Sequence, residues 1–234
     1  MTLPALVVGF SSTLQCVSSD YQKKTMKKYF ISLLLVSAVN LAYSQVKNKI
    51  FYNENLEEIT EPSFHKQKNF EKNLDIYFEN DTIMISFLIK RKNHGKLDDS
   101  NFKKLKKNLS PDKELINKIT VIVYYPGKDD CNETERNSTW SIFDKDYLKK
   151  LNKICDYNHF WVYKDDENLK YYHPKEVKWE KDNNQFIEKT FFEFHYPCFS
   201  AVIIDENGKF ISYFGEFGKS TIWELTTELI NKKE

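Results

Sequence analysis

The stretch from Phe194 to Phe210, "FHYPCFSAVIIDENGKF", constrains the fold of this chain more than any other. Residues 199–204 form an almost continuous apolar run, which is typical of a strand covered on both faces. The Asn207-Gly208 pair that follows favours a tight hairpin into a second strand. Pro197 stands just before the run, and proline cannot donate to a β-ladder, so it is tolerated only at the start of such a strand. We therefore expect an antiparallel pair of strands entered through a proline.

The residues before this pair predict a strand and helix alternation. Ile119–Tyr125, "ITVIVYY", is a second apolar, β-branched run and predicts another strand that is covered on both faces. The capping-box pattern of residues 141–144 predicts the start of a helix. A strand at 159–163, a short helix at 184–192 and a last helix capped at 221–224 complete the order β-α-β-α-β-β-α. One mixed sheet with helices on both faces accommodates the parallel crossover and the antiparallel hairpin of this order.

The first 44 residues have the layout of a targeting segment. Met26-Lys27-Lys28 is a short basic start, residues 29–39 are uncharged and mostly apolar, and Ala42 and Ser44 are the small residues of a cleavage site. This pattern predicts a signal peptide over 26–44, export to the periplasm or the extracellular space, and no stable membrane span after cleavage. An uncleaved N-terminal anchor helix is the alternative. Residues 1–25, ahead of the signal, are interpreted as a mis-called start or a disordered leader.

Residues 45–115 predict a β-rich N-terminal extension with one helix. Strands are expected at 49–52, 74–78 and 82–89, and an amphipathic helix at 98–109 follows an Asp/Ser cap. We recognise no chemical motif in this region. It either supplies an edge strand to the main sheet or packs as a separate layer.

Charge and cysteine content limit the function classes. Removing residues 1–44 takes away four Lys and one Asp, which changes the net charge from +1 to −2. A near-neutral surface with interspersed Lys and Glu gives no electrostatic reason to bind nucleic acid. The remaining cysteines are Cys131, Cys155 and Cys198, and no C-x-x-C occurs. In an exported protein such thiols can form a disulfide, and an odd number leaves at least one of them unpaired.

The stretch "YPCFSAVIIDENGKFISYFGEF", residues 196–217, resembles the thioredoxin-like superfamily. It is similar in its proline, apolar strand, aspartate, turn glycine and final strand ending in glycine, here Pro197, Asp205, Gly208 and Gly215. The resemblance implies an α/β, thioredoxin-like mixed sheet flanked by helices over 116–234, with spacing similar to the larger extracytoplasmic redoxins. It also implies a cis peptide before Pro197 and a binding groove for an exported protein or peptide, formed by His195, Tyr196 and Pro197.

The sequence departs from that family at the reactive site. The loop after the first strand reads "YYPGKDDCNETERNSTW" and keeps one cysteine, Cys131, with no partner two residues away. Asp129 and Asp130 beside it oppose formation of a thiolate. The expected topology brings Cys131 and Cys198 to one edge of the sheet, while Cys155 ends a helix at the opposite edge and is interpreted as a small core residue. A structural Cys131–Cys198 disulfide, a redox-active pair and two unrelated thiols remain open.

These features favour a non-catalytic or degenerate module with a binding or structural role. The alternative is an extracytoplasmic thiol–disulfide oxidoreductase with Cys131 as nucleophile and Cys198 as resolving thiol. Copper-handling relatives use two loop cysteines and a distant histidine, and His195 is the candidate here. With one loop cysteine the ligand set is incomplete, so we expect no metal and no other cofactor.

Overall fold

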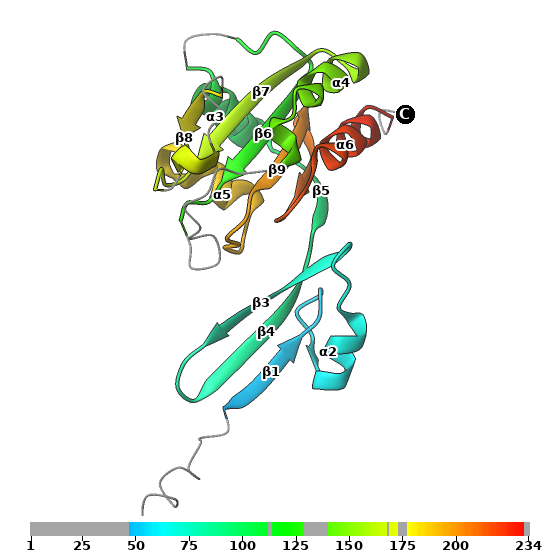
Figure 1. The fold of residues 1–234 in the computed structure, drawn as a ribbon, viewed down its shortest axis with the longest axis vertical. Helices are drawn as coiled ribbons and strands as arrows, with labels where there is room; N and C mark the ends of the chain where they lie inside the picture. The colour runs from blue at the N-terminus through cyan, green and yellow to red at the C-terminus, as the bar shows by residue number, and fades with distance from the viewer. Residues whose placement is uncertain (1–46, 112–113, 129–139, 168, 173–176, 232–234) are drawn as a thin grey trace, which may run out of the picture. The chain divides into compact units, whose positions relative to one another are not determined.

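The computed structural model of the chain describes residues 47–111, 114–128, 140–167, 169–172 and 177–231. Within these residues the protein is a mixed α/β structure with two β-sheets flanked by helices (Figure 1). The predicted leader (1–25) and signal peptide (26–44) lie outside them. No helix in the described part has the length and apolar character needed to cross a membrane.

The larger sheet has six strands in the order β5-β10-β9-β6-β7-β8. Strands β6, β7 and β8 run parallel, whereas β9 is antiparallel to both β6 and β10, and β5 is antiparallel to β10. Their bounds are β5 Lys92–Lys96, β6 Ile119–Tyr125, β7 Tyr157–Tyr163, β8 Trp179–Lys181, β9 Ser200–Asp205 and β10 Lys209–Tyr213. The predicted mixed sheet is therefore present, and β8 adds a short strand within the 164–192 segment.

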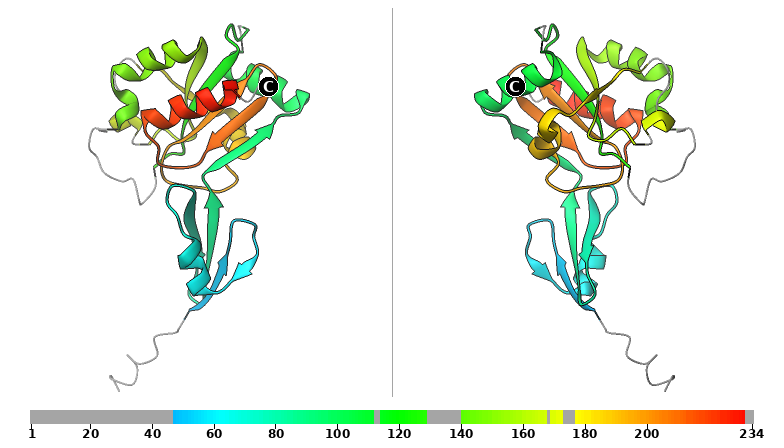
Figure 2. Two further views of the ribbon diagram at one scale, coloured as in Figure 1. Left: turned by 90° about the vertical axis from the view of Figure 1, so that its right-hand side faces the viewer. Right: turned by 90° about the vertical axis from the view of Figure 1, so that its left-hand side faces the viewer.

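Helices cover both faces of this sheet, and β6 is therefore buried along its whole length. On one face Val121 and Val123 pack beneath α4 (Asp146–Ile154) and α6 (Lys219–Asn231). On the other face Ile122 joins a second core with α3 (Asp99–Leu109) and α5 (Phe186–Phe191). Figures 1 and 2 show the helices that lie against this sheet. Burying an aliphatic side chain fully stabilises the fold by about 1.5–3 kcal/mol. The side chains of β6 point alternately to the two faces, so they favour helices on both sides of the sheet.

The second sheet has four strands in the order β2-β1-β4-β3. Helix α2 (Glu61–Gln67) covers one face through Phe64, which packs on Phe51 and Leu88. On the opposite face Leu74 and Ile76 join the second core of the larger sheet. The bounds are β1 Asn48–Tyr52, β2 Glu58–Ile59, β3 Asn73–Glu79 and β4 Ile83–Lys90.

Both alternatives for residues 45–115 thus occur together. Strand β5 supplies an edge strand to the larger sheet, and β1–β4 form a sheet of their own. The expectation of one helix was wrong, because α2 precedes α3. Its start is marked by Thr60, whose hydroxyl accepts a hydrogen bond from Ser63 N at 3.4 Å, and by a proline in the first turn.

The predicted capping box at residues 141–144 was also wrong. Residues Ser141–Phe143 form a short 3₁₀ turn (η2), and α4 begins later, at Asp146, without a side-chain cap. The Ser141 hydroxyl instead accepts a hydrogen bond from Lys219 N, at 3.3 Å, and so serves the first turn of α6. The Ser141 side chain therefore caps a helix that begins 78 residues later in the sequence rather than the helix that directly follows it.

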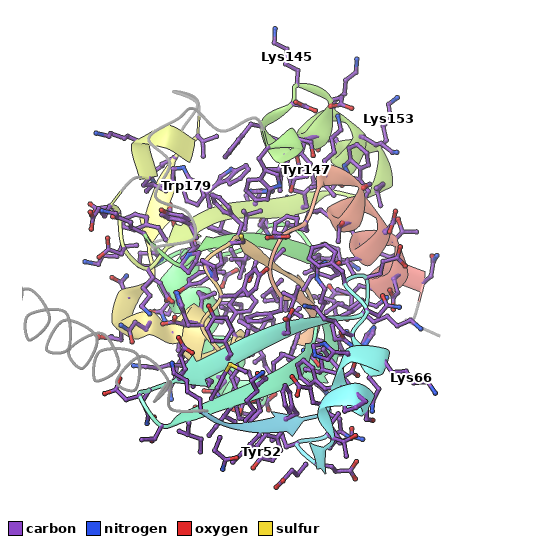
Figure 3. The ribbon with its side chains drawn as sticks, turned by 60° about the horizontal axis from the view of Figure 1, so that its bottom comes forward. Tyr52, Lys66, Lys145, Tyr147, Lys153 and Trp179 are labelled. Carbon is purple, nitrogen blue, oxygen red and sulfur yellow. The ribbon has the colours of Figure 1, made fainter. Side chains whose placement is uncertain are left out.

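A Tyr–His pair joins α4 to the sheet, with Tyr147 buried and His159 half-buried. Tyr147 points inward from α4, whereas Lys145 and Lys153 project outward (Figure 3). Tyr147 Oη and His159 Nε2 share a hydrogen bond of 2.8 Å, and the His159 ring lies 4.8 Å from the Trp161 ring. The other ring nitrogen, His159 Nδ1, is buried without a hydrogen-bond partner among the described residues. Burial lowers the pKa of His159 to about 3, so the folded protein holds this imidazole neutral.

This burial predicts a pH dependence of stability. The unfolded chain binds a proton at His159 below about pH 6.5, whereas the folded chain binds one only near pH 3. Above pH 6.5 the neutral His159 therefore costs the folded state nothing. As the pH drops from 6.5 towards 3, protonation of the unfolded chain lowers the free energy of unfolding. His159→Gln should reduce the loss of unfolding free energy between pH 7.5 and 5 by about 2 kcal/mol, measured by urea unfolding at both pH values.

The matched control is His65→Gln, which changes an exposed histidine on α2. It should leave the difference between pH 7.5 and 5 within about 0.5 kcal/mol of the parent protein. An unchanged pH dependence in His159→Gln would contradict the assignment of a neutral buried imidazole.

Candidate functional site

The predicted groove residues lie in the segment between α5 and β9. Tyr196, Pro197 and Cys198 are half-buried, and His195 is exposed. Cys131 lies outside the described residues, as do Asp129 and Asp130, so its pairing with Cys198 stays a prediction. No disulfide joins the two cysteines of the described part, Cys155 and Cys198.

The predicted cis peptide before Pro197 was wrong, because all peptide bonds among the described residues are trans. The strand pairing explains why the trans form is tolerated. The β6–β9 ladder begins at the Tyr124 and Ser200 pair, three residues after Pro197. The proline therefore removes no ladder donor, and the chain needs no special turn to enter the strand.

Tyr196 is held against the turn that follows β10. Its ring lies 5.4 Å from the Phe214 ring, and it covers Gly215, whose φ is +66°. A Cβ at position 215 would lie 2.5 Å from Tyr196 Cδ1 and 2.8 Å from Leu74 Cδ1. Both the left-handed conformation and the close approach therefore require glycine at this position.

Glu216 connects this turn to the segment that holds the thiol. The carboxylate oxygen Oε1 accepts hydrogen bonds from Tyr196 Oη at 3.3 Å and from Cys198 Sγ at 3.4 Å. Its φ of +36° is unusual for a residue with a side chain, so the turn holds Glu216 in a sparsely populated conformation. Burial, and then the nearby Glu216 carboxylate, raise the pKa of Tyr196, which keeps the phenol protonated as the donor.

Arg91, between β4 and β5, holds the same turn from the other side. It is 2% exposed, and its guanidinium donates to the carbonyl oxygens of Phe214 (3.3 Å), Phe70 (2.7 Å), Gly215 and Glu216. The guanidinium carbon lies 4.6 Å from the centre of the Phe70 ring and 4.7 Å from that of Tyr213. Five donors in a planar fork and two stacked rings are properties that lysine lacks.

Sequence reasoning missed both Arg91 and Glu216. A signal for the arginine exists, since only two of the 35 basic residues are arginines, the other being Arg136. An isolated arginine in such a lysine-rich chain indicates a need for several donors in one plane. Glu216 carries no comparable signal, because its role depends on a turn that the fold creates.

The Cys198 thiol donates its hydrogen bond to a carboxylate. A carboxylate accepts a hydrogen bond from S–H, and it would repel the negative charge of a thiolate. Activation of a cysteine nucleophile requires the opposite environment, with a cation, a base or a helix N-terminus beside the sulfur. The Glu216 carboxylate beside Cys198 does not supply such activation.

Cys155 lies at the other end of the sheet. It follows α4 and lines a cavity of about 410 Å³ together with Ile119, the first residue of β6. Burial, and then Asp156, raise the pKa of this thiol, as expected for a core cysteine. The described residues include no cluster of three or more His, Cys, Asp or Glu side chains that could hold a metal ion.

No protein-family model, no curated protein and no solved structure matches the chain. The class of the fold, mixed α/β with helices on both faces of the larger sheet, therefore rests on the topology described above.

Proposed function

We propose that the chain is an exported thioredoxin-fold protein that acts as a non-catalytic binding module. Its partner is an exported protein or peptide that is bound at the edge formed by His195, Tyr196 and Pro197. The alternative is a thiol–disulfide oxidoreductase that uses Cys131 and Cys198.

The order of the central strands carries the proposal. These strands lie in the order β10-β9-β6-β7. Strands β6 and β7, which α4 connects, are parallel, and β9 lies antiparallel beside β6. Helices α4 and α6 lie on one face and α5 on the other. This arrangement is similar to that of the thioredoxin-like superfamily, with β5 and α3 as additions. The C-terminal end of β6 and the loop before β9 meet at the same edge.

Two departures from the family support binding without catalysis. The peptide before Pro197 is trans, and the thiol of Cys198 donates a hydrogen bond to the Glu216 carboxylate. The lack of C-x-x-C in the whole sequence agrees with both.

Catalysis is tested by insulin reduction with dithiothreitol. The full chain should give the uncatalysed rate, and Cys131→Ser and Cys198→Ser should not change it. Activity that is lost in both variants and kept in Cys155→Ser, the matched control, would establish the oxidoreductase instead. Titration of thiols in denaturant, before and after mild reductant, then distinguishes an easily reduced bridge from a resistant structural one.

Binding is tested with the carboxymethylated insulin B chain, an extended peptide whose thiols are blocked. It should shift the amide resonances of His195, Tyr196 and Cys198 in the ¹⁵N-labelled full chain, and His195→Ala should weaken its affinity about three- to tenfold. Absence of shifts at this edge would overturn the binding proposal.

A further inference from the structure

A second concave site lies on the opposite face of the β9–β10 hairpin from α6. It is a groove of about 550 Å³, which is within the usual size of small-molecule and side-chain pockets. Its apolar lining is mainly aromatic and comes from the end of α5, the following segment and β10, namely Phe191, Phe192, Phe194, Phe210 and Phe214.

Close backbone packing creates this aromatic floor. Phe210 and Gly95 are opposite each other in the β5–β10 ladder. A Cβ on Gly95 would lie 2.5 Å from Phe210 Cζ, so the missing side chain lets the ring lie across β5. The Phe191 ring meets Phe210 edge-on at 5.0 Å, which fixes both rings.

Polar groups lie among the rings on the same floor. Ser212 and Asn93 are the next pair of the ladder, on the same face as Phe210, and both line the groove. Ser212 is 3% exposed, and within the described part of the chain no residue hydrogen-bonds its hydroxyl. A hydroxyl that faces a groove can both donate a hydrogen bond to a ligand and accept one from it.

The charges at the rim are balanced. Glu54 accepts a hydrogen bond from Asn73 at 2.7 Å, and Lys189 donates to the carbonyl of Asn184 at 3.1 Å, so both are committed within the protein. Lys90 and Glu193 remain as one positive and one negative exposed side chain lining the groove. This rim gives no preference for an anion or a cation, and it suits an uncharged ligand with dipolar groups.

A leucine at the rim strengthens the case for an apolar contact. Leu56 lines the groove, is 57% exposed and has a φ of +62°. The turn that holds it is fixed by Asn53, whose side chain accepts hydrogen bonds from Asn55 N and Glu57 N. A large apolar side chain is therefore presented to solvent beside the aromatic floor, in a backbone conformation that favours asparagine or glycine.

We infer that this groove binds an aromatic side chain of an extended polypeptide, with Ser212 and Asn93 bonding its neutral backbone. The inference rests on the proposed binding function and adds a specificity site to it. Phe194 links the two, because it lines the groove and stands directly before His195 in the chain.

The test uses the ¹⁵N-labelled full chain and N-acetyl-L-phenylalaninamide, an aromatic residue with a neutral backbone. This probe should shift the amides of Asn93 and Ser212 in a saturable manner. N-acetylglycinamide, which lacks the ring, and phenylacetate, which replaces the backbone by a carboxylate, should bind at least about tenfold more weakly. Equal binding of phenylacetate would overturn the inference in favour of a small aromatic anion.

Two variants and a matched control separate binding from folding. Phe194→Ala should weaken the probe about tenfold, whereas Phe78→Ala should not. Both rings pack on Phe87, at 6.2 and 6.0 Å, and only Phe194 lines the groove. Leu56→Asn should weaken the probe about three- to fivefold and yet raise the melting temperature by about 2–4 °C, because asparagine tolerates the left-handed conformation.

The outcomes for the two proposals are distinct. If the B chain shifts residues 195–198 and the phenylalaninamide shifts nothing at the groove, this inference fails and the binding function stands. If the phenylalaninamide binds at the groove and the B chain does not bind at residues 195–198, the groove stands and the proposed function fails. Phenylalaninamide binding that is unaffected by Phe194→Ala and Leu56→Asn would place it elsewhere and overturn the inference.

Discussion

Arg91→Met is expected to lower the free energy of unfolding by about 3–5 kcal/mol. Methionine retains apolar contact with the rings of Phe70 and Tyr213, and it removes every donor to the four carbonyl groups that the guanidinium satisfies. Each buried carbonyl that is left unpaired costs about 1–3 kcal/mol, and the turn can relax only in part. Urea unfolding monitored by tryptophan fluorescence measures the change.

Two further variants show what the arginine contributes. Arg91→Lys keeps a positive charge without the planar fork, so it should still lose about 2 kcal/mol or more. Lys92→Met, the matched control, changes the adjacent exposed residue, which forms an ion pair with Glu228 at 2.9 Å. Surface pairs contribute little, so this loss should stay below about 1 kcal/mol. An Arg91→Met protein as stable as Lys92→Met would contradict the role assigned to the guanidinium.

Gly215→Ala is expected to destabilise the protein by about 2–4 kcal/mol. The left-handed conformation costs about 1 kcal/mol for a residue with a Cβ, and the contact with the Tyr196 ring adds an overpacking penalty of about 1–3 kcal/mol. Because Tyr196 shares Glu216 with Cys198, the change should also increase the rate at which Cys198 reacts with a thiol reagent. Urea unfolding and thiol-labelling kinetics measure the two effects.

A double-mutant cycle isolates the contact with the ring. In a Tyr196→Ala background, Gly215→Ala should cost about 1–2 kcal/mol less than in the parent protein. Gly218→Ala is the control for a close contact without a left-handed backbone, since the added Cβ would lie 3.3 Å from Ser141 Oγ and the φ of Gly218 is not positive. Equal losses for Gly215→Ala in both backgrounds would show that backbone conformation alone requires the glycine.

The sequence predicted the centre of the larger sheet better than its margins. The run "ITVIVYY" became β6 with the expected bounds, because a strand that is buried on both faces can be recognised from its own composition. Strand β5, "KNHGK", has no such composition, and it is extended because β10 pairs with it. Helix α2 was missed for a related reason, since a single buried residue, Phe64, defines its apolar side.

The residues of the candidate site also fall into those that a local sequence pattern predicts and those that depend on distant contacts. The position of Tyr196, Pro197 and Cys198 before β9 followed from the hairpin pattern, which is local. Arg91 and the turn at 214–216 are 123–125 residues apart, and no local pattern connects them. The isomer of the peptide before Pro197 was predicted wrongly because it depends on where the β6–β9 ladder begins. The pairing of Cys131 stays a prediction, since that residue lies outside the described part.

The placement of Arg91 also determines how far the chain could be shortened. The last residue of β4 and the first residue of β5 are its two sequence neighbours, so one uninterrupted stretch of backbone belongs to both sheets. A truncated protein that begins after residue 97 would lack the outer strand beside β10 and the guanidinium that anchors residues 214–216. The N-terminal region is therefore an integral part of the same folding unit and could not be exchanged as a detachable module.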